Sequence, residues 1–401
     1  MLKKLRDTFR AESSWKQFFL SMLTMGLAYG LYKGVIDNYL AEIVTMSEFD
    51  RGVAEFFREL PGLMLVLILA VFYAFSAEQL FKLGAVIMVA GVGLLFALPA
   101  DRILVTIAIC VYSLGEHIQL GMKNTLSLEY ARPGASGQAL GLQNSINQVG
   151  TLAGYFVVMF AFLFVSGVTA FKAFFLIAAV IACVSAVLAM RITGRSETDK
   201  SKSRFYFRKK YTKYYMLEVF YGARKQVFFT FGPYVLILFY GAGTTTISLL
   251  FAVSAICCYF AAPLVGRIID RLGYKVVMVS DTLILVIVCF FYGFAHHIFP
   301  QQVAFVICCV NYVLDSVISL ASMASNVYVQ DISDNKEEVR ATISTGISVN
   351  HLITVLIALF GGWIWKTLGI ETLFTISAVL GLANSAYAAT IKGRGRLEAE
   401  A

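Results

Sequence analysis

The sequence predicts an all-α membrane protein with twelve transmembrane helices arranged as two pseudo-symmetric six-helix bundles. Three observations predict this fold. Of the 401 residues, 59% are hydrophobic and only 14% are charged, whereas a soluble protein carries about 25% charged residues. Long apolar segments recur along the chain, near the length of about 20 residues that a helix needs to cross the hydrocarbon layer. Short motifs of the first half also recur in the second half.

Twelve segments are predicted to span the bilayer, and each must be helical because unpaired backbone groups are too costly in lipid. The expected spans are residues 15–41, 53–76, 84–98, 103–128, 138–165, 171–190, 214–240, 246–269, 276–295, 303–329, 341–365 and 371–390. The N-terminus, the C-terminal tail and alternate loops carry 22 lysines and arginines, against three in the loops between them. Positive residues accumulate on the cytoplasmic side, so we expect both termini there and the protein in the cytoplasmic (inner) membrane.

The longest loop separates the two predicted bundles. It gives an N-terminal bundle over residues 1–190, a basic cytoplasmic linker over 191–213 and a C-terminal bundle over 214–401. The linker holds nine basic and two acidic residues, and its second part, "RFYFRKKYTK", mixes basic and aromatic side chains. This composition suits a segment lying on an anionic leaflet. No nucleic-acid binding is expected from so short a connector.

Repeated motifs connect the two halves to a known family. "YGLYKGV" in the first predicted span matches "YGARKQV" in the seventh, and "NTLSLE" in the fourth matches "NVYVQD" in the tenth. Between spans eight and nine stands "GRIIDRLGYK", which resembles the cytoplasmic loop signature of the major facilitator superfamily. Twelve spans in two parallel halves are similar to the same superfamily of secondary transporters.

The loop signature implies a latch on the cytoplasmic side. Its first glycine is expected to allow close helix approach, its Asp-Arg pair to form charged contacts, and Gly273 to permit a tight turn. The matching loop between spans two and three, "FSAEQLFKLG", is degraded, so we expect the working latch in the second half, against the loop after span four. The expected latch residues are Gly266, Asp270, Arg271, Glu129 and Arg132.

Two lysines within predicted spans indicate a binding site. Lys33 and Lys225 each cost about 2.5–3.5 kcal/mol at the bilayer centre on insertion scales, and such residues are usually functional. The resemblance implies that spans one and seven line the central cavity, and paired basic residues there are similar to the arginines of organophosphate:phosphate antiporters. We therefore expect a small anionic substrate. The expected binding residues are Lys33, Lys225, Arg224, Tyr29, Tyr221 and Arg58.

Two alternatives stay open for these cations. Asp37 lies four residues from Lys33, and Glu218 lies seven residues from Lys225, so each carboxylate shares a helical face with its lysine and could hold it in a structural pair. Arg58 could likewise form a local ion pair with Glu59 or contribute to an outer gate.

Acidic groups and a histidine within the spans are candidates for proton coupling. A desolvated carboxyl group can carry a proton, and histidine titrates near neutral pH. The expected proton-coupling residues are Glu116, His117, Asp315 and Glu59. Alternatively, Glu116 forms a salt bridge with Arg58 or Lys33. In span five, "GLQNSINQVGTLAG" partly resembles the glycine-rich antiporter motif of the superfamily, although its glycines equally suit close helix packing.

The sequence as a whole favours a secondary transporter that moves a small anion by alternating access, coupled to protons or a counter-anion. The alternatives are an efflux pump or flippase for amphiphiles and a membrane sensor. No motif supports an enzyme, and no cofactor is expected. His296 and His297 offer only two ligands, so no metal site is expected either. We expect a monomer in the lipid bilayer.

Overall fold

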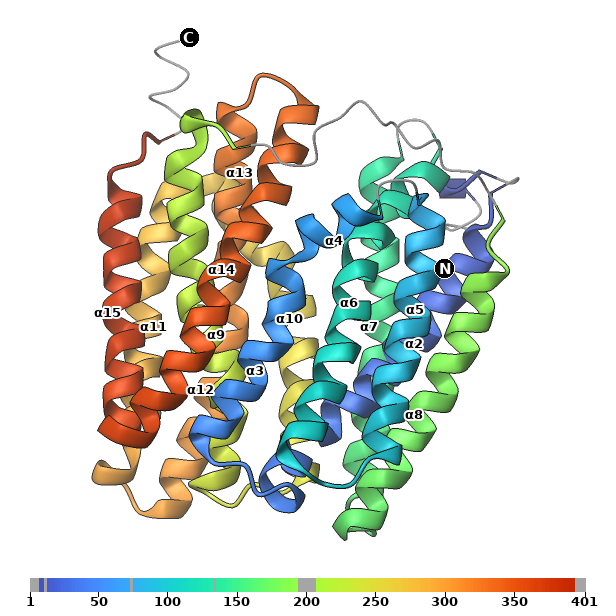
Figure 1. The fold of residues 1–401 in the computed structure, drawn as a ribbon. Coiled ribbons are helices and arrows are strands. Elements are labelled where there is room, and N and C mark those ends of the chain that lie inside the picture. Colours follow the sequence, from blue (N-terminus) through green and yellow to red (C-terminus); the bar gives the residue numbers. More distant parts are fainter. Residues whose placement is uncertain (1–6, 11–12, 73–74, 133–134, 194–206, 394–401) are drawn as a thin grey trace. The chain divides into compact units, whose positions relative to one another are not determined.

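The structure, a computed structural model, describes residues 7–10, 13–72, 75–132, 135–193 and 207–393. These residues are almost entirely helical, and their β-structure is limited to one isolated bridge between Phe9 and Ala131. Figure 1 shows the long helices coloured along the sequence. The all-α prediction is therefore confirmed.

The helix bounds follow the predicted spans closely. The first half contains α2 (Trp15–Asn38), a π-helical turn (Tyr39–Ile43), α3 (Glu48–Leu63), α4 (Leu65–Val71), α5 (Ala77–Ala97), α6 (Arg102–Tyr130), α7 (Ser136–Ala161) and α8 (Gly167–Met190). The second half contains the 3-10 turn η2 (Lys209–Tyr211), α9 (Thr212–Leu238), α10 (Thr244–Leu272), α11 (Tyr274–Ile298), α12 (Gln301–Ile318), the 3-10 turn η3 (Ser319–Ser322), α13 (Met323–Ile332), α14 (Lys336–Leu368) and α15 (Ile370–Ala389).

Two predicted spans are interrupted. The second turns at Met64, between α3 and α4, shortly after Pro61, which removes a helical hydrogen-bond donor. The tenth is broken by the 3-10 turn η3. Among the described residues, nine helical segments are long and apolar enough to cross a membrane by length and composition. The total of twelve spans stays a prediction.

Many large apolar side chains cover the outer surface of these helices. Phe164 is 87% exposed, Val71 75% and Ile103 70%, and similar residues recur on α8, α10, α11 and α12. Exposed apolar surface on this scale is uncommon in soluble monomers, and lipid chains cover it without cost. The surface therefore supports the membrane assignment independently of the helix lengths.

The chain divides into two compact units. The first comprises Met1–Thr45, Leu60–Lys202 and Gly243–Ala252, and the second comprises Met46–Glu59, Ser203–Ala242 and Val253–Ala401. Helix α3 thus belongs mostly to the second unit, although it precedes the linker in sequence. In the first unit, α2 packs against α7 and α8, and α5 packs against α6 and α8. In the second unit, α9 packs against α14 and α15, and α11 packs against α15 and α12.

Helix α2 approaches α7 closely through glycines on both helices. A Cβ atom on Gly154 would stand 2.7 Å from the backbone of Gly30, and one on Gly30 would meet the carbonyl oxygen of Thr151. Gly150 makes an equally close approach to α2, whereas a Cβ atom on Gly141 would meet no described atom within 4 Å. Two of the three glycines in the span-five motif therefore serve helix packing, as one of the two interpretations predicted.

Replacing Gly154 by alanine should destabilise the first unit, because the added methyl group forces α2 and α7 apart. Overpacking of this kind costs about 1–3 kcal/mol. Gly141→Ala is the matched control on the same helix, and it should leave the melting temperature unchanged or slightly raised, because alanine favours helix over glycine. Thermal unfolding of both variants in detergent measures the difference. Equal melting temperatures would show that the close approach does not limit stability.

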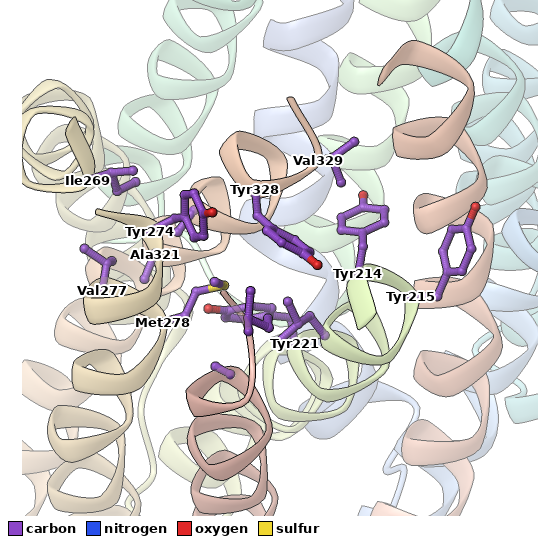
Figure 2. Packing of buried hydrophobic residues seen from close by; sticks show 14 of the residues in the cluster. Tyr214, Tyr215, Tyr221, Ile269, Tyr274, Val277, Met278, Ala321, Tyr328 and Val329 are labelled. Atoms are coloured by element: carbon purple, nitrogen blue, oxygen red, sulfur yellow. The ribbon is translucent and has the colours of Figure 1, made fainter. Parts of the chain in front are cut away.

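A tyrosine-rich core holds one end of the second unit together. Its buried rings come from the start of α9, from α11 and from α13, and they include Tyr214, Tyr221, Tyr274 and Tyr328. Figure 2 shows Tyr274 beside Tyr328, whose ring centroids are 5.5 Å apart. This core packs around the segment of α9 that precedes Arg224 and Lys225.

The described end of the basic linker docks on this unit. Lys210 lies 2.9 Å from Asp334 and 3.7 Å from Glu338, and Arg208 lies 3.5 Å from Glu338. Burial is the largest single effect on Lys210 and opposes its charged form, but the hydrogen bond to Asp334 and the nearby charges of Glu338 and Asp334 together outweigh it and raise the pKa of Lys210. Some of the linker charge is thus neutralised within the protein. The predicted contact of residues 194–206 with the leaflet lies outside the described residues.

Candidate functional site

Helix α2 holds Lys33 in an ion pair within the first unit. Lys33 is buried, and its Nζ lies 2.7 Å from Oδ2 of Asp37, one helical turn away. The ammonium group also stands 5.1 Å from the centre of the Phe251 ring, a cation–π distance. The structural pair predicted from the four-residue spacing therefore forms. Tyr29 lies one turn earlier, half-buried, with its ring 6.5 Å from that of Tyr32.

The Glu116–His117 pair of α6 is anchored locally. His117 is buried, and its Nδ1 lies 2.8 Å from the carbonyl oxygen and 3.0 Å from the hydroxyl of Ser113. Glu116 is half-buried on the neighbouring face, where its charge interacts with Lys123. A local cation thus acts on Glu116, in addition to the two partners considered from the sequence.

Helix α9 carries Arg224 into the interior of the second unit. Arg224 is 1% exposed, and its Nη1 lies 2.5 Å from Oδ2 of Asp281 on α11. The carboxylate of Asp315 on α12 acts on the same guanidinium electrostatically. Arg224 Nη2 and Asp315 Oδ1 are both buried without a hydrogen-bond partner among the described residues. One arginine therefore stands between two buried carboxylates from different helices.

This position bears on the role expected for Arg224. It was predicted beside Lys225 as a substrate contact, and in the structure it lies in the interior of the second unit, paired with Asp281. Tyr221 contacts Arg224, whose guanidinium lies 5.6 Å from the centre of the tyrosine ring. Its hydroxyl is buried, so Tyr221 belongs to the interior cluster as well. Successive residues on a helix point about 100° apart, so Arg224 and its neighbour Lys225 lie in different environments.

Lys225 has the opposite environment. It is exposed, although Tyr221–Arg224 and Gln226–Phe228 on either side of it are buried. Glu218 interacts with Lys225 electrostatically. The Glu218 carboxylate is instead hydrogen-bonded by Ser325 at 2.9 Å and lies 3.4 Å from Nδ2 of Asn350. The predicted Lys225–Glu218 pair does not form, because helices α13 and α14 supply closer partners for Glu218.

A charged network lies on α3 in the second unit. Buried Glu55 bonds to Arg51 at 2.8 Å and to Arg58 at 2.7 Å, and Gln226 of α9 donates to it at 3.0 Å. Arg58 also pairs with Glu59, as the local-pair interpretation predicted. The guanidinium of Arg58 stands 4.8 Å from the centre of the Phe229 ring.

Glu59 extends this network to α14. Its Oε2 accepts from the hydroxyl of Thr354 at 3.1 Å and lies 2.8 Å from Nδ1 of His351. The predicted proton-coupling residue Glu59 is thus connected to a titratable imidazole that the sequence analysis did not select. A buried acid joined to a histidine on another helix is a suitable path for proton transfer.

The predicted latch residues lie at the ends of α6 and α10. Gly273 has a φ of +81°, so the tight turn is confirmed. A Cβ atom on Gly266 would meet no described atom within 4 Å, so the expected close approach at this glycine does not occur. Asp270 and Arg271 are exposed, Glu129 is half-buried, and Arg132 donates to the carbonyl oxygen of Phe9 at 3.1 Å.

Four residues of these clusters escaped the sequence analysis as candidates: Arg51, Glu55, Asp281 and His351. Each is a charged or titratable group within a helix, and Arg51, Glu55 and Asp281 are buried whereas His351 is half-buried. The signal for Asp281 was available, since a single acid interrupts the apolar stretch "VVMVSDTLILV". Its partner could not be read from the sequence, because Arg224 is 57 residues away.

An all-helical fold with polar clusters inside apolar helices is compatible with a membrane protein that handles polar solutes. The family model of the Major Facilitator Superfamily matches residues 215–398. A solved structure of the nucleoside transporter NupG has a TM-score of 0.73 and 16% identity, covering 94% of this chain and 100% of its own. A solved structure of a D-xylose-proton symporter has a TM-score of 0.70 and 14% identity, covering 94% of this chain and 96% of its own. A solved structure of the peptide transporter POT has a TM-score of 0.70 and 13% identity, covering 96% of this chain and 95% of its own. No curated protein matches the sequence.

The family match and the shared fold confirm the resemblance drawn from the loop signature. Slightly less than half of the chain, residues 215–398, matches the model of this superfamily, and nearly the whole chain has the fold of solved membrane transporters. The fold and the apolar helices support a multi-pass membrane protein.

Proposed function

We propose that this transporter moves a small anionic substrate and that protons drive the movement. The observation that carries the anionic substrate is the exposed ammonium group of Lys225 between buried residues of α9. A lysine facing lipid at this depth is costly, so such a side chain usually faces water or a partner. Since the Glu218 carboxylate is hydrogen-bonded by Ser325 and Asn350 and acts on Lys225 only through its charge, an anion from solution is the direct partner that we propose for Lys225.

Lys33 contributes differently. Its ion pair with Asp37 keeps the charge neutral when no substrate is bound. An anion that approaches Lys33 competes with Asp37, and release of the carboxylate couples binding to a local rearrangement of α2. Lysine suits this exchange because its charge sits on a flexible stem.

Buried acids supply the proposed proton path. Asp315 beside Arg224, and Glu59 beside His351, each combine a carboxyl group with a titratable or charged partner inside the second unit. Glu116 and His117 are the candidates of the first unit. The fold alone does not choose the substrate, because the neighbouring structures are named for nucleosides, D-xylose and peptides.

The test starts with thermal stabilisation of the purified protein by phosphate, sulfate and small carboxylates, with neutral sugars and nucleosides beside them. The anion that stabilises the protein most is then titrated into Lys225→Gln. We expect its affinity to fall at least about tenfold, because a charge-assisted contact worth more than about 1.4 kcal/mol is lost. Lys275→Gln, a lysine at the start of α11, is the matched control and should bind normally.

A double variant distinguishes substrate binding by Lys33 from a purely structural ion pair with Asp37. If the pair with Asp37 is only structural, Lys33→Gln lowers the melting temperature and Lys33→Gln/Asp37→Asn restores it with binding intact. If Lys33 binds substrate, the double variant is stable and still fails to bind. Selective stabilisation by neutral solutes, unaffected by Lys225→Gln, would refute the anionic substrate.

A further inference from the structure

Two histidines and a glutamate converge at one end of the second unit. His296 and His297 stand in the last turn of α11, and Glu371 stands in the first turn of α15. These two helices lie side by side (Figure 1). Oε1 of Glu371 lies 3.2 Å from Nε2 of His296 and 2.8 Å from Nε2 of His297. All three potential ligand atoms lie within 4.8 Å of one another.

It is unusual for two successive residues of a helix, here His296 and His297, to contact the same atom, Oε1 of Glu371. Successive side chains diverge by about 100° around an α-helix, yet these two imidazoles have ring centroids only 3.9 Å apart at an interplanar angle of 41°. The ring of His296 also packs against the ring of Phe239, with 4.7 Å between the two ring centroids. The end of α11 thus presents both Nε2 atoms to the same carboxylate.

The backbone before α15 leaves room for the third ligand. Gly369 has a φ of +89°, and a Cβ atom at this position would stand 2.7 Å from Oε2 of Glu371. A glycine therefore permits both the turn into α15 and the placement of the carboxylate. The sequence alone provided two adjacent histidines, and the fold brings the acid 74 residues further along the chain to them.

We propose that His296, His297 and Glu371 bind a divalent transition-metal ion of the zinc type. Bonds of about 2.0–2.2 Å from nitrogen and oxygen ligands to zinc place tetrahedral ligands roughly 3.3 Å from one another. The observed nitrogen–oxygen separations of 3.2 and 2.8 Å are close to this value. An ion therefore enters with small side-chain shifts, and it replaces the two contacts to Glu371 by three metal bonds.

The chemistry of the three ligands selects the ion. Imidazole suits zinc, nickel, cobalt and copper, whereas calcium and magnesium prefer ligand sets made of oxygen. Three protein ligands leave a fourth position for water. His297 is 58% exposed and Glu371 32%, so the ion reaches the site from solution. This site does not depend on the anionic substrate or on the proton path.

A bound ion would join the end of α11 to the start of α15. Any ligand that binds only the folded state stabilises it, in proportion to the logarithm of ligand concentration over Kd. The metal is therefore expected to raise the melting temperature of the transporter, whether or not substrate is present.

The test uses the full chain in detergent after removal of any affinity tag and treatment with a chelator. Titration with zinc should show one strong site, a rise in melting temperature, and, with cobalt in place of zinc, visible absorption of a four-coordinate ion. Glu371→Gln and His297→Asn should each weaken zinc binding about 100-fold or more, since even outer partners of metal ligands contribute 10–100-fold. Because His297 is exposed, its replacement leaves packing intact and isolates the loss of a ligand.

His351→Asn is the control, because it removes a histidine of the same unit from a different acidic partner. It should keep the zinc affinity of the unmodified chain. The proposal is overturned if zinc fails to bind with one-to-one stoichiometry, or if binding persists in His297→Asn and Glu371→Gln. Loss of binding in His351→Asn alone would equally overturn it.

Discussion

Replacing Arg224 by methionine should cost the protein about 3–5 kcal/mol of folding stability, the largest effect that we expect from a single substitution. The guanidinium is 1% exposed and lies 2.5 Å from Asp281. Removing one member of a buried ion pair leaves the other charge without compensation. For a unit of this size, such a loss lowers the melting temperature by about 10 °C. Thermal unfolding in detergent, followed by tryptophan fluorescence, measures it.

The double variant Arg224→Met/Asp281→Leu is the control for this effect. It removes both charges, and apolar replacement of a buried pair is often neutral or stabilising. Much of the lost stability should therefore return. The sequence-based interpretation of Arg224 as a substrate contact makes a different prediction, in which Arg224→Met melts normally and fails to bind the anion. That result would contradict the ion-pair interpretation.

The residues of the Arg224 cluster show which parts of the site could be predicted. Charges inside apolar spans are conspicuous in a sequence because they are costly in a membrane, and this argument selected Lys33, Arg224 and Asp315. It also predicted the Lys33–Asp37 pair, since four residues separate neighbours on one helical face. The partner of Arg224 depends on how α9 and α11 pack, which no local spacing encodes.

Lys225 is a second residue that the sequence identified without identifying its partner. Sequence spacing placed it with Glu218 on one face of α9, but two other helices provide closer hydrogen bonds to that carboxylate. Opposite exposure of Arg224 and Lys225 likewise follows from the orientation of α9 in its unit. Spacing alone therefore identified the charged residues and left their partners open.

The fold was predictable to a greater depth than the site. Apolar segments of the expected length became helices because the bilayer leaves the backbone no alternative. Errors concentrate at helix ends: predicted span two begins at residue 53, whereas α3 begins at Glu48 and carries Arg51 within its first turns. These polar residues lie outside the apolar pattern, so hydropathy excluded them. Arg51 was missed for this reason, whereas Glu55 lies within the predicted span and was not selected.

The helices that fail the length-and-hydropathy criterion are informative in the same way. Among the described helices of the predicted spans, α3 with α4, α7 and α9 are absent from the set of nine. Helices α3 and α9 carry the Glu55 and Arg224 clusters, and α7 carries the polar motif that contains Gly154. Helices α3 and α4 are too short for the criterion, with 16 and 7 residues. Helices α7 and α9 have 26 and 27 residues, so length does not exclude them, and both contain buried polar side chains.

Asp315→Asn should abolish proton-driven accumulation of the anion while the protein stays folded. Asp315 is buried, and its Oδ1 has no hydrogen-bond partner among the described residues. Replacing an acid without a close partner by a neutral amide removes the cost of a buried charge, so the melting temperature should hold or rise. Asp281→Asn, which breaks the contact to Arg224, should lower it. The melting temperatures of Asp315→Asn and Asp281→Asn therefore distinguish the two acids beside Arg224.

Transport assays in proteoliposomes then test the coupling role of Asp315. An amide cannot take up and release a proton, so a pH gradient should no longer drive accumulation in Asp315→Asn. Exchange of labelled for unlabelled anion needs only the conformational cycle and should continue at a measurable rate. If accumulation on a pH gradient persists at the level of the unmodified chain, Asp315 does not carry the coupled proton. The path through Glu59 and His351 would then be the next candidate to test within the second unit, since a buried acid meets an imidazole there.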